Sequence, residues 1–331
     1  MWFKSFSTVC VALIGFVATI EGSDDQKQQV RILTLGHVDH GMESVTTAIL
    51  KRQASRQLAQ TSSIAELVKP RPSADFSKSF KIMRAEVTYE TNKRKYSHVQ
   101  CQHHADYIKE LIAGAKRFDG AILVVSAADG PMPQTREHIG LARKVGIPAL
   151  VVFLDKCNLV DDKELLELVE LETRELLTKY GYPGDDVPFV RGSSYLANDN
   201  PDDAEKMKCI DDLLTAVDKH IPVSRPEDSP LSSSGLKKCE AYIYHLSVDD
   251  GGRKTALVSG YQGSFRISET SGVTGRLSSV STDECAPGDA TEVSIDLDSP
   301  VSLQRGLRFT VQEENRTIAV GVVTGLGGTG K

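Results

Sequence analysis

Two glycines near the start of the chain have the spacing of a phosphate-binding loop. The motif G-x-x-x-x-G-K-[ST] wraps backbone N–H groups around phosphates, with its lysine on their oxygens and its hydroxyl on Mg²⁺. Gly36 and Gly41 fit this spacing, but Met42 and Glu43 stand where Lys and Ser or Thr are required. Methionine carries no charge, and a glutamate roughly 4 Å from a phosphate opposes binding by about 1–4 kcal/mol. The sequence therefore predicts a loop that keeps its turn and has lost its phosphate-binding side chains.

The elements around this loop are those that normally position such a site. The run VRILTLG leads into it, and residues 44–53 are compatible with a helix. Further along, GAILVVSA is apolar throughout, which is typical of a strand buried on both faces, and PALVVFLD predicts another buried strand. Helical patterns alternate with β-rich runs up to residue 222. This alternation predicts an α/β domain with a doubly wound parallel sheet.

The pattern changes after a stretch rich in Ser and Pro, which is typical of a linker. Short alternating or β-branched runs, separated by turn residues, follow to the end of the chain. They predict an all-β barrel. We therefore expect an α/β domain at residues 23–222, a linker at 223–236 and a barrel at 237–331.

The first residues have the pattern of a targeting segment. Lys4 is followed by a weakly polar to apolar run from Phe6 to Ile20 and then by the small residues Gly22 and Ser23. This order predicts a secretory signal peptide at residues 1–22. The run is shorter than the roughly 20 residues that a membrane span needs, so we expect no membrane segment in the mature chain. A mitochondrial presequence is the alternative, but such segments are rich in Arg, and the first Arg here is Arg31.

Charge and cysteine content narrow the function classes. The formal net charge of −6 gives no overall cationic field for nucleic acid. One of the six cysteines, Cys10, lies in the leader, and the other five are scattered without the spacing of a disulfide framework or a zinc site. Cys239 and Cys285 are the pair that could meet within one domain, and the sequence leaves open whether they do. Asn315 begins a glycosylation sequon between two predicted strands.

Several long stretches resemble elongation factor Tu of the bacterial and mitochondrial branch. LGHVDHG, HADYIKELIAGA, DGPMPQTREHIGLARKVG and YPGDDVPFVRGSS resemble its GTPase domain. DDGGRKTALVSGYQGSFRI, APGDATEVSIDLDSPV and GLRFTVQEENRTIAVGVV resemble its third domain, a β-barrel. The family's middle domain has no counterpart between them. Since that domain helps to hold the aminoacylated end of transfer RNA, the resemblance argues against binding of aminoacyl-tRNA and the ribosome.

The resemblance also implies which residues would bind a nucleotide. The base-recognition motif NKxD appears as Asp155-Lys156-Cys157-Asn158, with its outer residues exchanged. The family's aspartate accepts two hydrogen bonds from guanine. The amide of Asn158 has one acceptor and one donor, so one of these contacts would bring two donors together. The positions that match the family's nucleotide site, and that we interpret as vestigial, are Gly36, His37, Val38, Asp39, His40, Gly41, Asp155, Lys156, Asn158, Ser193 and Ser194.

The two switch regions of the family have changed as well. Gln100 replaces the aspartate that supports Mg²⁺, and His103 replaces the glycine whose N–H meets the γ-phosphate. Lys81 aligns with the threonine that completes the Mg²⁺ shell. His104 matches the catalytic histidine and would be vestigial. The positions that have lost their chemical role are Met42, Glu43, Lys81, Gln100 and His103.

These changes favour a catalytically inactive, secreted relative that acts as a binding or interaction protein with a protein partner of unknown identity. No cofactor is expected in that case, whereas GTP or GDP with Mg²⁺ is expected under the alternative, a GTP-binding translation elongation factor of mitochondrial type. A translated pseudogene or a mis-spliced chain is a third interpretation. His37, His40, His103 and His104 could suggest zinc or copper, but we interpret them as family residues left near the former phosphate site and expect no metal.

Overall fold

The computed structural model describes residues 27–60, 69–72, 81–114, 117–223, 235–267, 272–314 and 316–327. The predicted signal peptide and Asn315 lie outside these residues. The α/β domain contains the following elements in chain order: β1 (Gln28–Gly36), η1 (Val38–His40), α1 (Met42–Ser55), β2 (Lys69–Pro72), β3 (Lys81–Glu90), β4 (Arg94–Cys101), α2 (His104–Ala113), β5 (Gly120–Ser126), α3 (Pro133–Lys144), β6 (Leu150–Asp155), η3 (Cys157–Leu159), α4 (Lys163–Lys179), β7 (Phe189–Arg191), α5 (Ser194–Asp199) and α6 (Ala204–His220).

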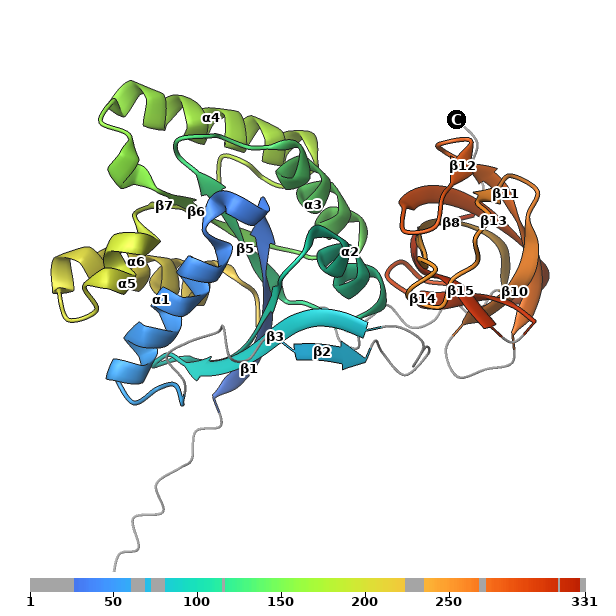
Figure 1. The fold of residues 1–331 in the computed structure, drawn as a ribbon, viewed down its shortest axis with the longest axis horizontal. Helices are drawn as coiled ribbons and strands as arrows, with labels where there is room; N and C mark the ends of the chain where they lie inside the picture. The colour runs from blue at the N-terminus through green and yellow to red at the C-terminus, as the bar shows by residue number, and fades with distance from the viewer. Residues whose placement is uncertain are drawn as a thin grey trace, which may run out of the picture.

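The sheet of this domain has the strand order β2-β3-β4-β1-β5-β6-β7, with helices on both faces (Figure 1). Within the run β4-β1-β5-β6-β7, every pair of adjacent strands is parallel. At the other edge, β3 is antiparallel to both β2 and β4. The prediction of a doubly wound sheet is confirmed. The short turn between β3 and β4 places these two strands in an antiparallel hairpin at this edge.

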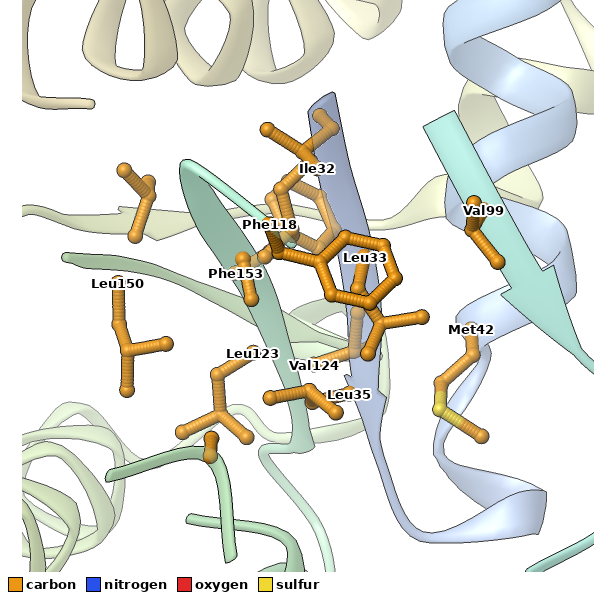
Figure 2. Close-up of a cluster of buried hydrophobic side chains, with 14 of the residues drawn as sticks. Ile32, Leu33, Leu35, Met42, Val99, Phe118, Leu123, Val124, Leu150 and Phe153 are labelled. Atoms are coloured by element: carbon orange, nitrogen blue, oxygen red, sulfur yellow. The ribbon is translucent and has the colours of Figure 1, made fainter. Parts of the chain in front are cut away.

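The central strands are buried on both faces, as their continuous apolar sequences predict. All residues of β5 and β6 are buried, and β1 is buried from Val30 onward. Figure 2 shows Leu35, Leu123 and Phe153 among the side chains of this core. Burying one such side chain contributes about 1.5–3 kcal/mol. This core fixes the strand ends from which the loops of the site emerge.

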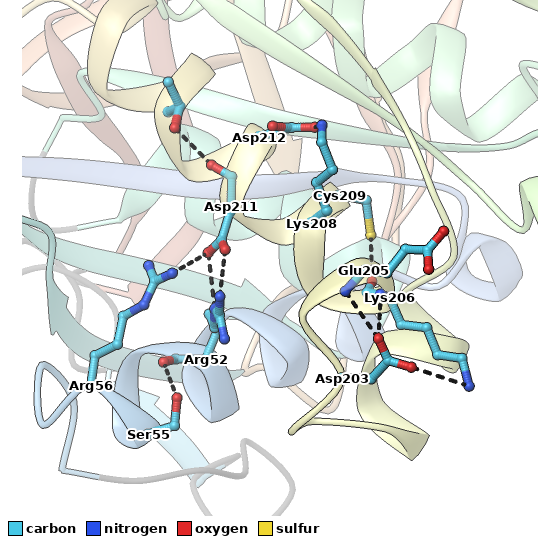
Figure 3. Close-up of polar contacts among 11 residues, drawn as sticks. Arg52, Ser55, Arg56, Asp203, Glu205, Lys206, Lys208, Cys209, Asp211 and Asp212 are labelled. Carbon is cyan, nitrogen blue, oxygen red and sulfur yellow. Dashed lines mark hydrogen bonds and ion pairs between the residues drawn. The ribbon is translucent and has the colours of Figure 1, made fainter.

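Helix α6 is fixed at its start by a cap and along its length by an ion-pair cluster. The side chain of Asp203 accepts hydrogen bonds from the backbone N–H groups of Glu205 and Lys206 (Figure 3). Further along, the Asp211 carboxylate accepts from Nε and Nη2 of Arg52 at 3.0 and 2.6 Å. Nη2 of Arg56 lies 2.8 Å from the same group. The cluster joins α6 to α1, the helix that follows the phosphate-type loop.

Replacing Asp211 with alanine is expected to lower the free energy of unfolding by about 1 kcal/mol, because both arginines are partly exposed. The matched control is Asp212→Ala on the same helix, which removes only a pair with the exposed Lys208. It should change stability by less than about 0.5 kcal/mol. Urea unfolding of both variants measures the difference, and equal losses would contradict the role assigned to Asp211.

The C-terminal domain is a closed barrel with the strand order β10-β11-β13-β8-β15-β14. Its strands, including a separate two-stranded ladder of β9 and β12, are β8 (Leu236–His245), β9 (Leu257–Val258), β10 (Gln262–Ile267), β11 (Val273–Val280), β12 (Glu284–Cys285), β13 (Ala290–Val301), β14 (Arg308–Glu313) and β15 (Arg316–Leu326). The predicted barrel is confirmed. Cys239 and Cys285 are both buried and free, so the disulfide that the sequence left open is not formed. Burial raises the pKa of Cys239 to about 12 and that of Cys285 to about 11.

The barrel packs against α2 through β8 and β15 (Figure 1). Tyr244, Leu246, Val320 and Val322 of the barrel belong to the same buried cluster as the core of the α/β domain. At the edge of this contact, Lys109 Nζ lies 2.6 Å from Asp250 Oδ2. Among the described residues, no helix is long and apolar enough to cross a membrane.

Candidate functional site: a degenerate nucleotide-binding site

The loop between β1 and α1 adopts a turn that depends on its two glycines. Gly36 has φ +151° and Gly41 has φ +94°, a region that residues with a Cβ rarely adopt. A Cβ at Gly36 would strike the carbonyl oxygen of Val124, and one at Gly41 would strike Oδ2 of Asp155. The turn predicted from the two glycines is therefore present.

Met42 is buried at the start of α1. Its side chain is 3% exposed and belongs to the core cluster, as Figure 2 shows at the start of α1. Its sulfur accepts a hydrogen bond from the Tyr107 hydroxyl at 3.4 Å. The position where a phosphate-binding lysine is required has become part of the packing between α1 and α2.

The surface in front of the loop offers little positive charge. Glu43 is exposed in the first turn of α1, where the helix dipole favours an acid. Together with Asp39 it lines an open hollow at the loop. Of the described residues that line this hollow, Lys51 alone is cationic, and its Nζ donates to the backbone oxygen of Asn198 at 2.9 Å. A phosphate group placed here would therefore meet two carboxylates and one lysine that is already engaged.

Gln100, at the position of the metal-supporting aspartate, is 5% exposed and belongs to a buried polar chain. Its Nε2 donates to the Tyr107 hydroxyl at 2.7 Å, and its Oε1 accepts from Thr46 Oγ1 at 3.3 Å. The chain continues from Thr46 to Thr34 at 3.3 Å and from Thr34 to His98 Nε2 at 2.5 Å. The Gln100 amide is thus held by internal partners, and an amide is a weaker Mg²⁺ ligand than a carboxylate.

His103 and His104, which match the second switch region of the family, also have protein groups beside their rings. His103 is the extended residue before α2, and its Nδ1 lies 3.1 Å from Asp106 Oδ2. His104 Nδ1 lies 2.9 Å from His138 Nε2, and its other ring nitrogen lies 3.2 Å from Glu137. The hydrogen bond to His104 lowers the pKa of Glu137. The residue that matches the catalytic histidine is therefore held against α3.

The base-recognition loop is ordered around Asp155. This carboxylate is 2% exposed and accepts from the backbone N–H groups of Lys156 and Ser194, both at 2.8 Å, and from the Ser194 hydroxyl at 2.5 Å. Burial raises the pKa of Asp155, and these hydrogen bonds oppose the shift. Lys156 has φ +60°, and its Nζ donates a hydrogen bond to the backbone carbonyl oxygen of Asp39 at 2.7 Å. Asp155 therefore ties the base loop to α5 and lies directly against Gly41.

The remaining predicted residues are placed as follows. Asn158 is exposed in η3, and the Ser193 side chain caps α5 by accepting from the Leu196 N–H. Lys81 begins β3, and the three residues before it lie outside the described part. His37 and His40 have ring centroids 5.0 Å apart, and burial lowers the pKa of His40 to about 4. Within the described ranges, no group of three or more His, Cys, Asp or Glu residues could hold a metal ion.

Sequence reasoning missed Tyr107, Thr46 and His98, which fill the space behind the loop. Tyr107 lies in a helix with an apolar pattern, and His98 lies in a predicted strand, so each reads as a structural residue. Only their contacts in the structure, with Gln100, with Met42 and with one another, show that they belong to the site.

The architecture defines a class of protein: an α/β domain of the P-loop GTPase type, followed by a six-stranded barrel, as in translational GTPases. The family model described as "Elongation factor Tu GTP binding domain" matches residues 27–223, and the one described as "Elongation factor Tu C-terminal domain" matches residues 232–326. The chain belongs to the elongation factor Tu family. Only residues 224–231 separate the two matches, so the family's middle domain is absent between them.

Proposed function

We propose that this chain is a catalytically inactive member of its family, a secreted pseudo-GTPase that acts as a binding or interaction protein. The observation that carries the proposal is the burial of Met42 against Tyr107 at the position of the phosphate-binding lysine. Gln100 bonded into the core and Glu43 at the mouth of the loop support it. Catalysis of phosphoryl transfer depends on positioned charge, and this site has lost the charges that the reaction needs.

The proposed ligand is another protein, of unknown identity. Aminoacyl-tRNA and the ribosome are not proposed as partners, because the middle domain is absent and the net charge is −6. No nucleotide, Mg²⁺ or other metal is proposed as a cofactor.

The alternative, a GTP-binding elongation factor of mitochondrial type with GTPase activity, has specific support from the loop itself. The glycine turn persists, and Lys156, Ser193 and Ser194 keep their places around it. If nucleotide binds, these groups and the backbone of residues 36–41 would hold it.

Titration of the chain from residue 23 onward with a fluorescent GDP analogue and Mg²⁺ is expected to give no saturable signal at micromolar concentrations. The lysine, the metal-supporting aspartate and the base-binding aspartate each make a charge-assisted bond worth about 1.5–3 kcal/mol. Losing all three corresponds to at least a roughly thousandfold loss of affinity. An intact elongation factor Tu assayed in parallel provides the control. Micromolar or tighter binding would overturn the pseudo-GTPase proposal.

Secretion is expected when the full chain is expressed with a C-terminal tag in animal cells. The tagged protein should appear in the medium without residues 1–22, which N-terminal sequencing of the secreted material would show. A shift in gel mobility after glycosidase treatment would indicate a glycan at Asn315. Recovery of the tag in mitochondria would overturn the secretory assignment in favour of the presequence.

A further inference from the structure

A second pocket lies where the barrel meets the α/β domain. It has a volume of 470 Å³, within the range of about 300–1,000 Å³ that is usual for small-molecule sites. Its lining residues are Arg117, Arg143, Lys144, Val145, Gly146, Arg305, Gly306 and Thr324. Four of them are cationic, and none of these described lining residues is acidic.

This pocket is at the opposite end of the sheet from the degenerate nucleotide site. The phosphate-type loop follows the end of β1, whereas Arg117 precedes the start of β5 and Gly146 precedes the start of β6. Because β1, β5 and β6 are parallel, the residues that precede these strands lie at one end of them, and the residues that follow lie at the opposite end. The pocket is therefore separate from the site described above.

The four cations come from three segments of the chain. Arg143 and Lys144 are in the last turn of α3, where the helix dipole favours positive charge. The dipole does not account for Arg117, which precedes β5, or for Arg305, which lies in the turn between β13 and β14. The fold thus adds one arginine from each domain to the charged end of α3.

Two of these cations are held in place by neighbouring groups. The Arg143 guanidinium lies over the Tyr182 ring, 5.2 Å from its centroid. Lys144 forms an ion pair with Glu292 of the barrel and lies over the Tyr242 ring, 5.0 Å from its centroid. Glu292 therefore balances the charge of Lys144, while the described residues that line the pocket include no acid.

Gly306 brings the barrel turn close to the cations of the other domain. It has φ +79°, and a Cβ built on it would lie 3.3 Å from Nη2 of Arg117 and 3.8 Å from the carbonyl oxygen of Val145. The absence of a side chain lets the turn with Arg305 approach Arg117 and the end of α3. Like charges gathered in this way repel one another, and an anion between them would relieve the repulsion.

We propose that this pocket binds a small polyanion carrying two or more phosphate or sulfate groups, and that the bound anion strengthens the contact between the two domains. Arginine recognises both kinds of group through its planar, multiply donating guanidinium. A ligand that contacts Arg117 or Arg143 on one side and Arg305 on the other would join the two domains directly.

The test is calorimetric titration of the purified protein with pyrophosphate and, separately, with sucrose octasulfate, at constant ionic strength. We expect saturable binding of at least one of them and a rise in melting temperature on saturation. Arg305→Ala and Arg143→Ala should each weaken that binding at least tenfold. The matched control Arg276→Ala removes an exposed barrel arginine, paired with Asp296, outside the pocket, and should leave the affinity unchanged.

The two probes distinguish the source of the anion. Binding of pyrophosphate alone identifies a phosphorylated ligand, and binding of sucrose octasulfate alone identifies a sulfated one. The proposal is overturned if neither probe binds saturably, if Arg276→Ala weakens binding as much as Arg305→Ala, or if Arg305→Ala binds as the parent does. In the last case the anion would bind elsewhere on the protein. A loss of binding in Lys51→Ala would then place it in the hollow beside Met42.

Discussion

Replacing Glu110 with alanine is expected to lower the free energy of unfolding by about 3–5 kcal/mol, because it removes the central acid of a buried charge cluster. Glu110 on α2 has no exposed surface. Its carboxylate forms ion pairs with Arg84 and, at 3.4 Å, with Arg31. Burial raises the pKa of Glu110, while Arg84, Arg31 and the barrel residue Arg308 oppose this shift.

Without Glu110, Arg31 and Arg84 would remain nearly buried beside each other, with side chains only 9% exposed. Glu86 lies 3.4 Å from Arg31 and 3.8 Å from Arg84, but it is 31% exposed and compensates only in part. The cluster also bears on the domain contact, since Arg308 of the barrel donates to the backbone oxygens of Leu111 on α2 and of Gly114 at its C-cap.

Urea unfolding at pH 7 measures the loss. Glu137→Ala is the control, because Glu137 is also a helical glutamate but is 42% exposed and paired only with His104. It should cost less than about 1 kcal/mol. A loss below about 1 kcal/mol for Glu110→Ala would show that the arginines find water or other partners, and that the cluster does not hold α2 in place.

The parts of the fold that the sequence predicted correctly are those with a local signal. Strand β5 is buried along its whole length, and the apolar run GAILVVSA is enough to predict that burial. Strand β2 has no such signal. Its sequence KPRP contains two prolines, and it is tolerated as a strand because it lies at the edge of the sheet. Helix α5, with six residues, is too short for a period to be recognised.

The candidate site was predictable as a set of positions but not as a set of contacts. The motifs showed that Met42 and Gln100 had lost their roles. They could not show that Met42 turns into the core or that Gln100 joins Tyr107, since these contacts join α1, β4 and α2. Likewise, the motif showed that His104 matches the catalytic histidine, but it could not show that its ring contacts His138 on α3.

Lowering the pH from 7 to 5 is expected to lower the free energy of unfolding, because three histidines are buried in the neutral form and together contribute about 6 kcal/mol. Burial lowers the pKa of His98 to about 3 and those of His138 and His40 to about 4. In the unfolded chain each titrates near its ordinary value of about 6.5. Below that pH the unfolded state binds protons that the folded state excludes, so stability falls as the pH falls.

The size of the loss follows from the pH window. Each group contributes about 1.4 kcal/mol per pH unit below pH 6.5, hence about 2 kcal/mol at pH 5. The acids whose pKa values are lowered, such as Glu86 and Glu137, begin to matter only below their ordinary value of 4.5. Glu110 and Asp155, whose pKa values are raised by burial, take up protons more readily in the folded state and so oppose part of this loss.

His98 is the better residue for a test, because its ring lies between the hydroxyls of Thr34 and Tyr89 inside the core. Urea unfolding of His98→Gln at pH 7, 6 and 5 should show a smaller dependence on pH, reduced by about 1.4 kcal/mol per unit. If His98→Gln loses stability on acidification as steeply as the parent, the neutral buried histidine is not what makes this fold sensitive to acid.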